Sequence, residues 1–194
     1  MILEGIVTTL AEDGTLNVAP MGPEVEPGDL RRFTLKPFRT STTYRNLKAT
    51  GEGVLHVSDD VLLIARAAIG TVADAPTLPT RVVRGRILAS AARYHEFRVV
   101  ELDDHNDRTR IVVETVAEGR LRDLFGLNRG KHAVVEAAIL ATRLAFLPRE
   151  SVLDDFRRLA VLVDKTGGPA EREAFALLEA HARAHPGPDG GARP

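Results

Sequence analysis

The stretch that decides the fold is Arg39-Thr40-Ser41-Thr42-Thr43, where four hydroxyl side chains follow a cation. It lies between a strand-like run at 32–36 and a helix-like run at 44–50. A strand that leads into a helix aims backbone N–H groups at one point, and the helix N-terminus adds about half a positive charge there. Because phosphate groups bind at such points, and because Arg39 can add a bidentate contact, the stretch indicates a phosphate site.

An ordinary helix cap is the alternative interpretation of the same residues. Ser and Thr are favoured at the N-cap, where the hydroxyl accepts from a backbone N–H of the first turn. A cap needs one such residue, and here four stand in a row. Phosphate binding and simple capping both stay open at this point.

Strand-like segments surround this stretch and dominate the first 120 residues. Each is enriched in β-branched residues and bounded by turn residues, a pattern typical of strands. Two helices interrupt them, at 41–50 and 60–69, and each ends at a glycine. We expect the strands at 2–10, 15–21, 31–36, 54–57, 81–92, 93–102 and 108–117.

The last third of the chain has the pattern of helices. Apolar residues at helical spacing predict helices at 127–143, 151–163 and 170–184. Pro148 separates the first two of these, and Gly167-Gly168 ends the second. The segment after His185 is rich in Pro and Gly, so we expect it to be disordered.

Several short motifs follow one another in a fixed order. They are Ile6-Val7-Thr8-Thr9, Asp13-Gly14, Leu16-Asn17-Val18-Ala19-Pro20-Met21-Gly22, Arg39-Thr40-Ser41-Thr42-Thr43, Arg45-Asn46-Leu47 and Gly51-Glu52-Gly53-Val54. This order resembles the FMN-binding split barrel, as in flavin reductases and pyridoxamine-phosphate-oxidase-like proteins. A later run, 126–138, resembles one branch of it, a family of uncharacterised archaeal and bacterial proteins. The resemblance covers roughly residues 2–145.

The resemblance implies an α+β fold, an antiparallel split β-barrel with a C-terminal helical segment. The barrel would span 1–120, helices at 121–185 would pack on it or on a dimer partner, and 186–194 would be a disordered tail. It also implies a homodimer with FMN near the interface. The phosphate would lie on the hydroxyl-rich loop and the ring along Asn17 to Met21. The implied cofactor contacts are Thr8, Thr9, Asn17, Ala19, Pro20, Met21, Arg39, Thr40, Ser41, Thr42, Thr43, Asn46, Asn128, Arg129 and Lys131. A related phosphorylated flavin or a deazaflavin stays an alternative to FMN.

The reaction is less well specified than the cofactor. Cations and a histidine open the helix at 127–143, against the helix dipole, so a solvated first turn and an anion contact are both open there. His132 is the candidate for acid–base chemistry. The first hypothesis is a flavin-dependent oxidoreductase that uses a nicotinamide nucleotide or another small molecule. The alternatives are a non-catalytic FMN carrier, store or sensor, and a plain oligomeric scaffold whose loop is only a cap.

Composition narrows the class of protein. The chain has 194 residues, of which 44% are hydrophobic and 27% charged, as in a globular protein. The absence of cysteine excludes disulfides, thiolate metal sites and thiol catalysis, and it fits a cytoplasmic protein. A net charge of −1 without a basic stripe argues against nucleic acid. The sequence has no run of about 18 apolar residues, so it predicts no membrane span.

Two further clusters have competing interpretations. The run Asp103-Asp104-His105-Asn106-Asp107 has ligands for a hard cation, but these residues also dominate hairpin turns, which we favour. His181 and His185 have a spacing that suits zinc, yet no HExxH motif accompanies them. We therefore predict no metal site.

Overall fold

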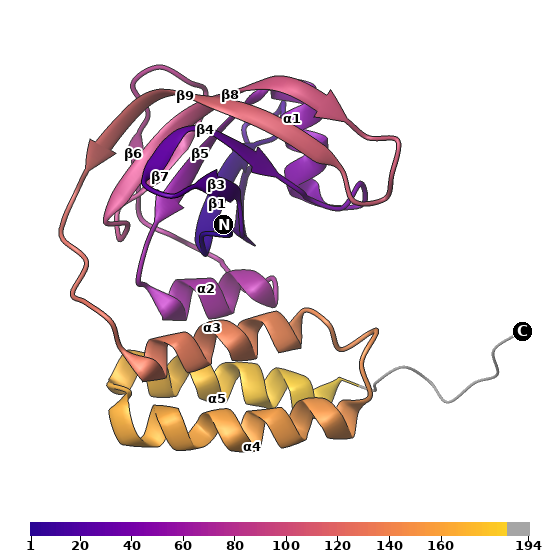
Figure 1. Cartoon of the computed structure of the whole chain (residues 1–194), viewed down its shortest axis with the longest axis vertical. Coiled ribbons are helices and arrows are strands. Elements are labelled where there is room, and N and C mark those ends of the chain that lie inside the picture. The colour runs from indigo at the N-terminus through magenta and orange to yellow at the C-terminus, as the bar shows by residue number, and fades with distance from the viewer. Residues whose placement is uncertain (186–194) are drawn as a thin grey trace, which may run out of the picture. The chain divides into compact units, whose positions relative to one another are not determined.

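The computed structural model describes residues 1–185, which form two compact units (Figure 1). The first, here called the barrel unit, comprises residues 1–59 and 73–124. Among the described residues, the second, here called the helical unit, comprises 60–72 and 125–185. The segment 186–194, for which the sequence predicts a disordered tail, lies outside the described residues.

The barrel unit is built on a seven-stranded antiparallel sheet in the order β2-β1-β5-β8-β9-β4-β3. A separate hairpin of two short strands and one helix, α1 (Thr42–Thr50), complete the unit. The strands are β1 (Gly5–Leu10), β2 (Leu16–Met21), β3 (Glu24–Glu26), β4 (Asp29–Leu35), β5 (Glu52–Val57), β6 (Thr77–Pro79), β7 (Arg86–Leu88), β8 (Arg93–Asp103) and β9 (Arg110–Arg120).

The sheet curls until its two ends approach each other. The residues before β1 pair with β3, through an Ile2–Glu24 bridge and a hydrogen bond of 2.8 Å from the Val25 N–H to the Met1 carbonyl. Inside the curl, Phe33 and Phe97 pack edge to face with ring centroids 5.6 Å apart. Tyr44 of α1 joins this core. The predicted antiparallel split barrel is thus confirmed.

One predicted strand is wrong. Of the segment 81–92, only Arg86–Leu88 forms a strand, β7. The reason is the fully buried carboxylate of Glu96, which accepts the backbone N–H groups of Arg81, Val82 and Val83 at 2.7–3.0 Å. These donors are engaged by a side chain, so the segment wraps around Glu96 as a loop.

The helical unit contains four helices, which pack on one another. They are α2 (Val61–Ala68), α3 (Arg129–Ala141), α4 (Arg149–Thr166) and α5 (Pro169–Ala184). The sequence places α2 within the barrel range 1–120, whereas the structure groups it with the C-terminal helices. Helix α2 packs against α3 and α5, and its buried residues are Val61, Ile64 and Ala65. Among the described helices, none is long and apolar enough to cross a membrane.

Candidate phosphate and flavin site

The hydroxyl-rich loop joins β4 to α1 and is fixed at both ends. At its start, the Arg39 N–H donates to the Asp107 carbonyl at 2.9 Å. Thr109 donates to the Pro37 carbonyl through both its N–H, at 3.0 Å, and its hydroxyl, at 2.8 Å. At its end, the Thr43 hydroxyl accepts from the side-chain amide of Asn17 at 3.0 Å. The loop therefore runs from β9 to β2 across the end of the curled sheet.

The capping interpretation holds for one residue of the loop. Ser41 is the N-cap of α1, and its hydroxyl accepts the Tyr44 N–H at 3.1 Å. Thr40 and Thr42 are exposed, and Thr43 is buried. The first turn of α1 has no acidic residue. Hydroxyl groups and positive dipole thus remain at this helix end beyond what capping uses.

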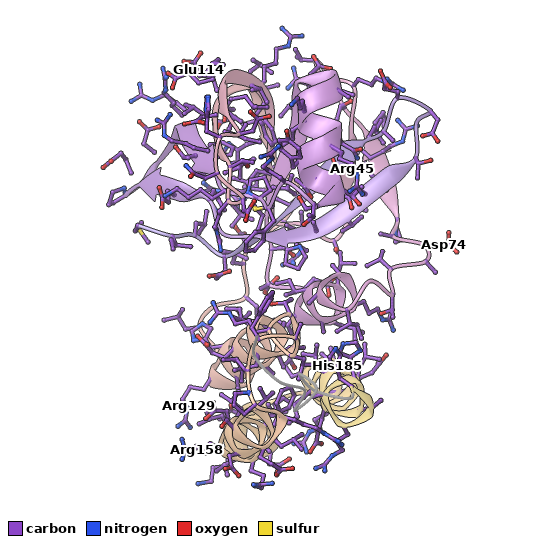
Figure 2. The ribbon with its side chains drawn as sticks, turned by 90° about the vertical axis from the view of Figure 1, so that its right-hand side faces the viewer. Arg45, Asp74, Glu114, Arg129, Arg158 and His185 are labelled. Atoms are coloured by element: carbon purple, nitrogen blue, oxygen red, sulfur yellow. The ribbon has the colours of Figure 1, made fainter. Side chains whose placement is uncertain are left out.

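Arg45 is a candidate site residue that the sequence analysis missed. Its guanidinium folds back toward the helix N-terminus, donating to the Thr40 carbonyl at 2.7 Å and to the Thr42 hydroxyl at 2.9 Å (Figure 2). Within residues 1–185, no carboxylate lies at ion-pair distance from Arg39 or Arg45. Two such cations at a helix N-terminus oppose its dipole, and an anion would relieve that repulsion. The i, i+3 spacing of Thr42 and Arg45 was the available signal.

A network of side-chain hydrogen bonds holds α1 against β1 and β2. The Asn17 amide donates to the hydroxyls of Thr9, at 3.2 Å, and Thr43, at 3.0 Å. The Asn46 amide also donates to Thr9, at 3.0 Å. Thr9, Thr43 and Asn46 are buried. Both amide donors of Asn17 are therefore engaged within the protein, and the network fixes the direction of α1.

Strand β2 offers a half-exposed edge beside this network. It lies at one end of the sheet order, and all six of its residues are partly exposed. An edge strand leaves backbone N–H and C=O groups unpaired. Ala19 pairs in register with Val7 and lies on the same face of β2 as Asn17 and Met21. Ala19 is the smallest side chain on this face, and Met21 beside it packs against the barrel core.

One predicted contact, Thr8, and the neighbouring Gly22 serve other purposes in the structure. Thr8 points away from Thr9, and its hydroxyl donates to the Arg86 carbonyl at 2.6 Å. A Cβ at Gly22 would lie 2.8 Å from Cγ2 of Ile2, so this glycine makes room for the N-terminal segment. Pro20 and Met21 are half-buried on β2.

Models of one protein family match almost the whole chain. Two models match, and both carry the description "protein of unknown function (DUF447)". The model of the N-terminal domain matches residues 3–122, and the second model matches residues 128–180. The chain belongs to the DUF447 family. No curated protein sequence matches it.

Solved structures agree with this assignment. The DUF447 chain is similar to an FMN-bound protein of the same family from Methanosarcina mazei, at 25% identity, covering 93% of this chain and 94% of that one, with a TM-score of 0.80. An FMN-binding protein from Thermus thermophilus, at 15% identity, covers 61% and 70% with a TM-score of 0.51. An NADH:FAD oxidoreductase from Streptomyces globisporus, at 13% identity, covers 61% and 70% with a TM-score of 0.52. The last two show the fold alone.

The predicted contacts from the run 126–138 lie in the helical unit of the DUF447 chain. Asn128 caps α3, accepting the Lys131 N–H at 3.0 Å, and its amide donates to the Thr166 carbonyl at 2.9 Å. The Lys131 ammonium lies 3.0 Å from the Glu171 carboxylate. Arg129, which Figure 2 shows at the start of α3, and His132 are exposed. Asn128 and Lys131 thus join helices within their own unit.

The acidic turn between β8 and β9 is attached to α1. The Asp104 carboxylate accepts from the Lys48 ammonium at 2.7 Å and from the Tyr44 hydroxyl at 2.6 Å. These hydrogen bonds, Lys48 first and Tyr44 second, lower the pKa of Asp104 from 3.8 to about 2. Among the described residues, no group of His, Cys, Asp or Glu could hold a metal ion. The Asp104 carboxylate therefore attaches this turn to α1.

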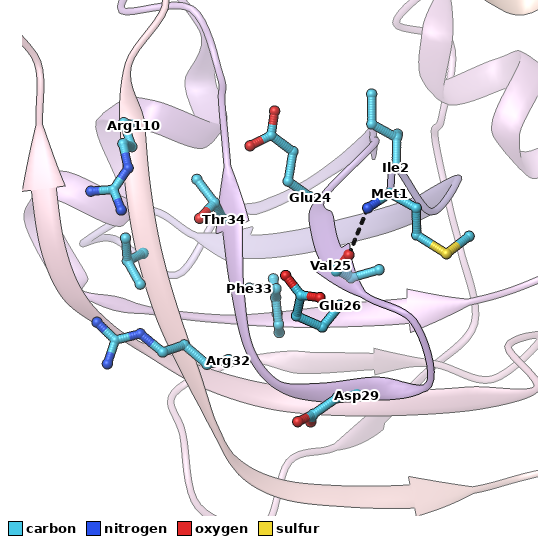
Figure 3. Close-up of a pocket in the computed structure, with 11 residues that line it drawn as sticks. Met1, Ile2, Glu24, Val25, Glu26, Asp29, Arg32, Phe33, Thr34 and Arg110 are labelled. Atoms are coloured by element: carbon cyan, nitrogen blue, oxygen red, sulfur yellow. Dashed lines mark hydrogen bonds between the residues drawn. The ribbon is translucent and has the colours of Figure 1, made fainter.

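A cavity of about 570 Å³ opens on another part of the barrel unit. Figure 3 shows Arg32 and Arg110 on one side of it and Glu24 and Glu26 on the other. Arg32 and Arg110 both pair with Glu101. No residue from 37–46 lines this cavity, so we do not assign it to the phosphate loop.

Proposed function

We propose that this protein binds FMN, with the phosphate at residues 39–43 and the ring along β2. The observation that carries the proposal is the N-terminus of α1, where Arg39 and Arg45 have no carboxylate at ion-pair distance within residues 1–185. A dianionic phosphate would neutralise both guanidinium groups and accept from the exposed hydroxyls. The FMN-bound relative, which matches over most of both chains, supports the choice of ligand.

The ring contacts follow from the edge strand. Because both Asn17 amide donors are engaged by Thr9 and Thr43, Asn17 acts by positioning α1. Unpaired backbone groups of β2 are then the partners for the polar edge of the ring. Ala19 allows the ring to approach the strand closely.

We further propose that the protein is a flavin-dependent oxidoreductase and works as a homodimer. FMN, when bound, supplies hydride or electron transfer, and the reductant we propose is a nicotinamide nucleotide. The chain's own residues hold the phosphate and orient the ring. A non-catalytic FMN carrier is the second candidate, because the network beside β2 consists of Thr and Asn side chains, which do not titrate at physiological pH.

Three measurements test these proposals in turn. Purified protein should be yellow or should quench FMN fluorescence on titration, and failure of both would contradict flavin binding. NADH or NADPH should bleach the visible spectrum of bound FMN, and air should restore it over repeated cycles. A stable yellow complex that neither nucleotide bleaches would favour the carrier. Light scattering should give twice the monomer mass of 21.1 kDa if the protein is a homodimer.

A further inference from the structure

An exposed phenylalanine precedes the phosphate loop and has a cation over its ring. Phe38 is 51% exposed, and it is followed directly by Arg39. The guanidinium carbon of Arg108 lies 5.1 Å from the centre of the Phe38 ring. Over the part of the chain that the structure describes, no carboxylate lies at ion-pair distance from Arg108. An apolar planar surface and an uncompensated positive charge therefore face solvent together.

The backbone fixes this pair firmly. Phe38 and Arg108 form an antiparallel bridge between the loop and the start of β9. On one side of the bridge, the buried Thr109 donates twice to the Pro37 carbonyl. On the other, the Arg39 N–H donates to the Asp107 carbonyl. The backbone that carries the ring is thus fixed before any ligand arrives, which lowers the entropy cost of stacking on it.

The pair lies at the end of the loop that is remote from the proposed flavin ring. The loop ends at Thr43, which is bonded to Asn17 of β2. It starts beside β9, and three strands separate β9 from β2 in the sheet. If the ring of a ligand lies on β2 and its phosphate lies at 39–43, the direction from the ring to the phosphate runs along the loop toward Phe38. Any group attached to that phosphate would reach Phe38 and Arg108.

We propose that the site also accepts FAD, whose adenylate half is attached at that point. The adenine would stack on Phe38, and the second phosphate would lie between Arg39 and Arg108. Base stacking on an aromatic ring and a cation that supports it are common in nucleotide binding. The proposal rests on the proposed function, because it takes the flavin phosphate to lie at 39–43.

The test compares FMN with FAD on the same variants. Dissociation constants are measured by flavin fluorescence for the parent protein, Phe38→Ala, Phe38→Tyr and Arg108→Ala. Phe38→Ala should weaken FAD about tenfold, the loss expected for one stacked base, while FMN changes less than about twofold. Phe38→Tyr should keep most of the FAD affinity, since it retains the ring. Arg108→Ala should also weaken FAD more than FMN.

The control is Phe146→Ala, since Phe146 is another exposed phenylalanine, at 79%, in the helical unit. It should leave both dissociation constants unchanged. Parent protein that binds FMN but not FAD would overturn the inference and leave the proposed function standing. Equal weakening of both flavins in Phe38→Ala, or unchanged FAD affinity there, would also overturn it. Parent protein that binds neither flavin would contradict the proposed function itself.

Discussion

The N-termini of α1 and α3 look alike in the sequence and differ in the structure. Each begins with a polar cap, Ser41 or Asn128, and each has cations nearby. At α3, Lys131 pairs with Glu171, and Gly130 approaches Gly167 so closely that a Cβ would lie 2.9 Å from its Cα. At α1, no carboxylate within residues 1–185 pairs with the neighbouring arginines. The position of the counter-charge therefore distinguishes the proposed phosphate site at α1 from the structural joint at α3.

The largest expected effect comes from blocking the ring end of the α1 site. Ala19→Leu places a larger side chain on the face of β2 that Ala19 shares with Asn17 and Met21, where the flavin ring is proposed to lie. Forced overlap costs about 1–3 kcal/mol, so FMN should bind up to about a hundredfold more weakly. Fluorescence titration measures this, and a thermal melt checks the fold. Parent affinity and an unchanged visible spectrum in a folded variant would place the ring elsewhere.

Removing a cation should separate the two helix ends. Arg39→Ala should weaken FMN about ten- to a hundredfold, because a charged hydrogen bond is worth roughly 1.5–3 kcal/mol. Arg39→Lys should recover part of this, since lysine lacks the planar fork. The matched variant at the other helix, Arg129→Ala, should leave FMN affinity unchanged. Equal losses in the two variants would abolish the distinction drawn between α1 and α3.

Acid should distinguish the units that carry these helices. Burial lowers the pKa of His56 in the barrel unit from 6.5 to about 4, since its ring accepts the Leu88 N–H and cannot gain a proton freely. A lowered histidine pKa gives stability that is complete above pH 6.5 and is lost as the pH falls toward 4. Between pH 7 and pH 5 the barrel unit should lose about 2 kcal/mol.

The helical unit provides the contrast, because none of its described residues is a buried histidine. Hydrogen exchange at pH 7 and pH 5 should show faster opening of the barrel strands than of the helices. His56→Gln should reduce that pH dependence. Equal sensitivity of both units to acid would count against the role given to His56.

The smallest expected effect is at the cap of α3. Asn128→Ala removes the cap hydrogen bond and the bond to the Thr166 carbonyl, so the helical unit should lose about 1–2 kcal/mol of stability. FMN affinity should stay within about twofold of the parent. Chemical denaturation and flavin titration measure the two quantities on one sample. A large loss of FMN affinity with unchanged stability would return Asn128 to the cofactor site.

The sequence predicted what local chemistry determines. Ser41 as a cap, a helix at 41–50 and its end at Gly51, which has a φ of 68°, all depend on neighbours in the chain. The motif order was enough to identify the split barrel. Arg45 was missed because its role depends on hydrogen bonds back to Thr40 and Thr42. The motif Arg45-Asn46-Leu47 was used only for its place in the order of motifs.

Contacts between distant residues were harder to foresee. Residues 81–83 form a loop because their N–H groups donate to the buried carboxylate of Glu96, which lies more than ten residues later in the chain. The amphipathic pattern of α2 shows that it packs, without showing on which unit. The pairing of Lys131 with Glu171 depends on how α3 meets α5. Sequence patterns specify the donors and charges, and the fold determines their partners.

The anchoring of the phosphate loop at both ends links cofactor binding to the order of folding. Asn17 and Asp107, which hold its two ends, come from opposite parts of the barrel sequence. Both must be in place before the loop has its final shape, and such non-local pairing is slow. In a nascent chain, the phosphate loop therefore cannot reach its final shape until β9 has been synthesised. Flavin would then bind the completed barrel alone and stabilise it by mass action, so cellular flavin supply would influence how much of the protein stays folded.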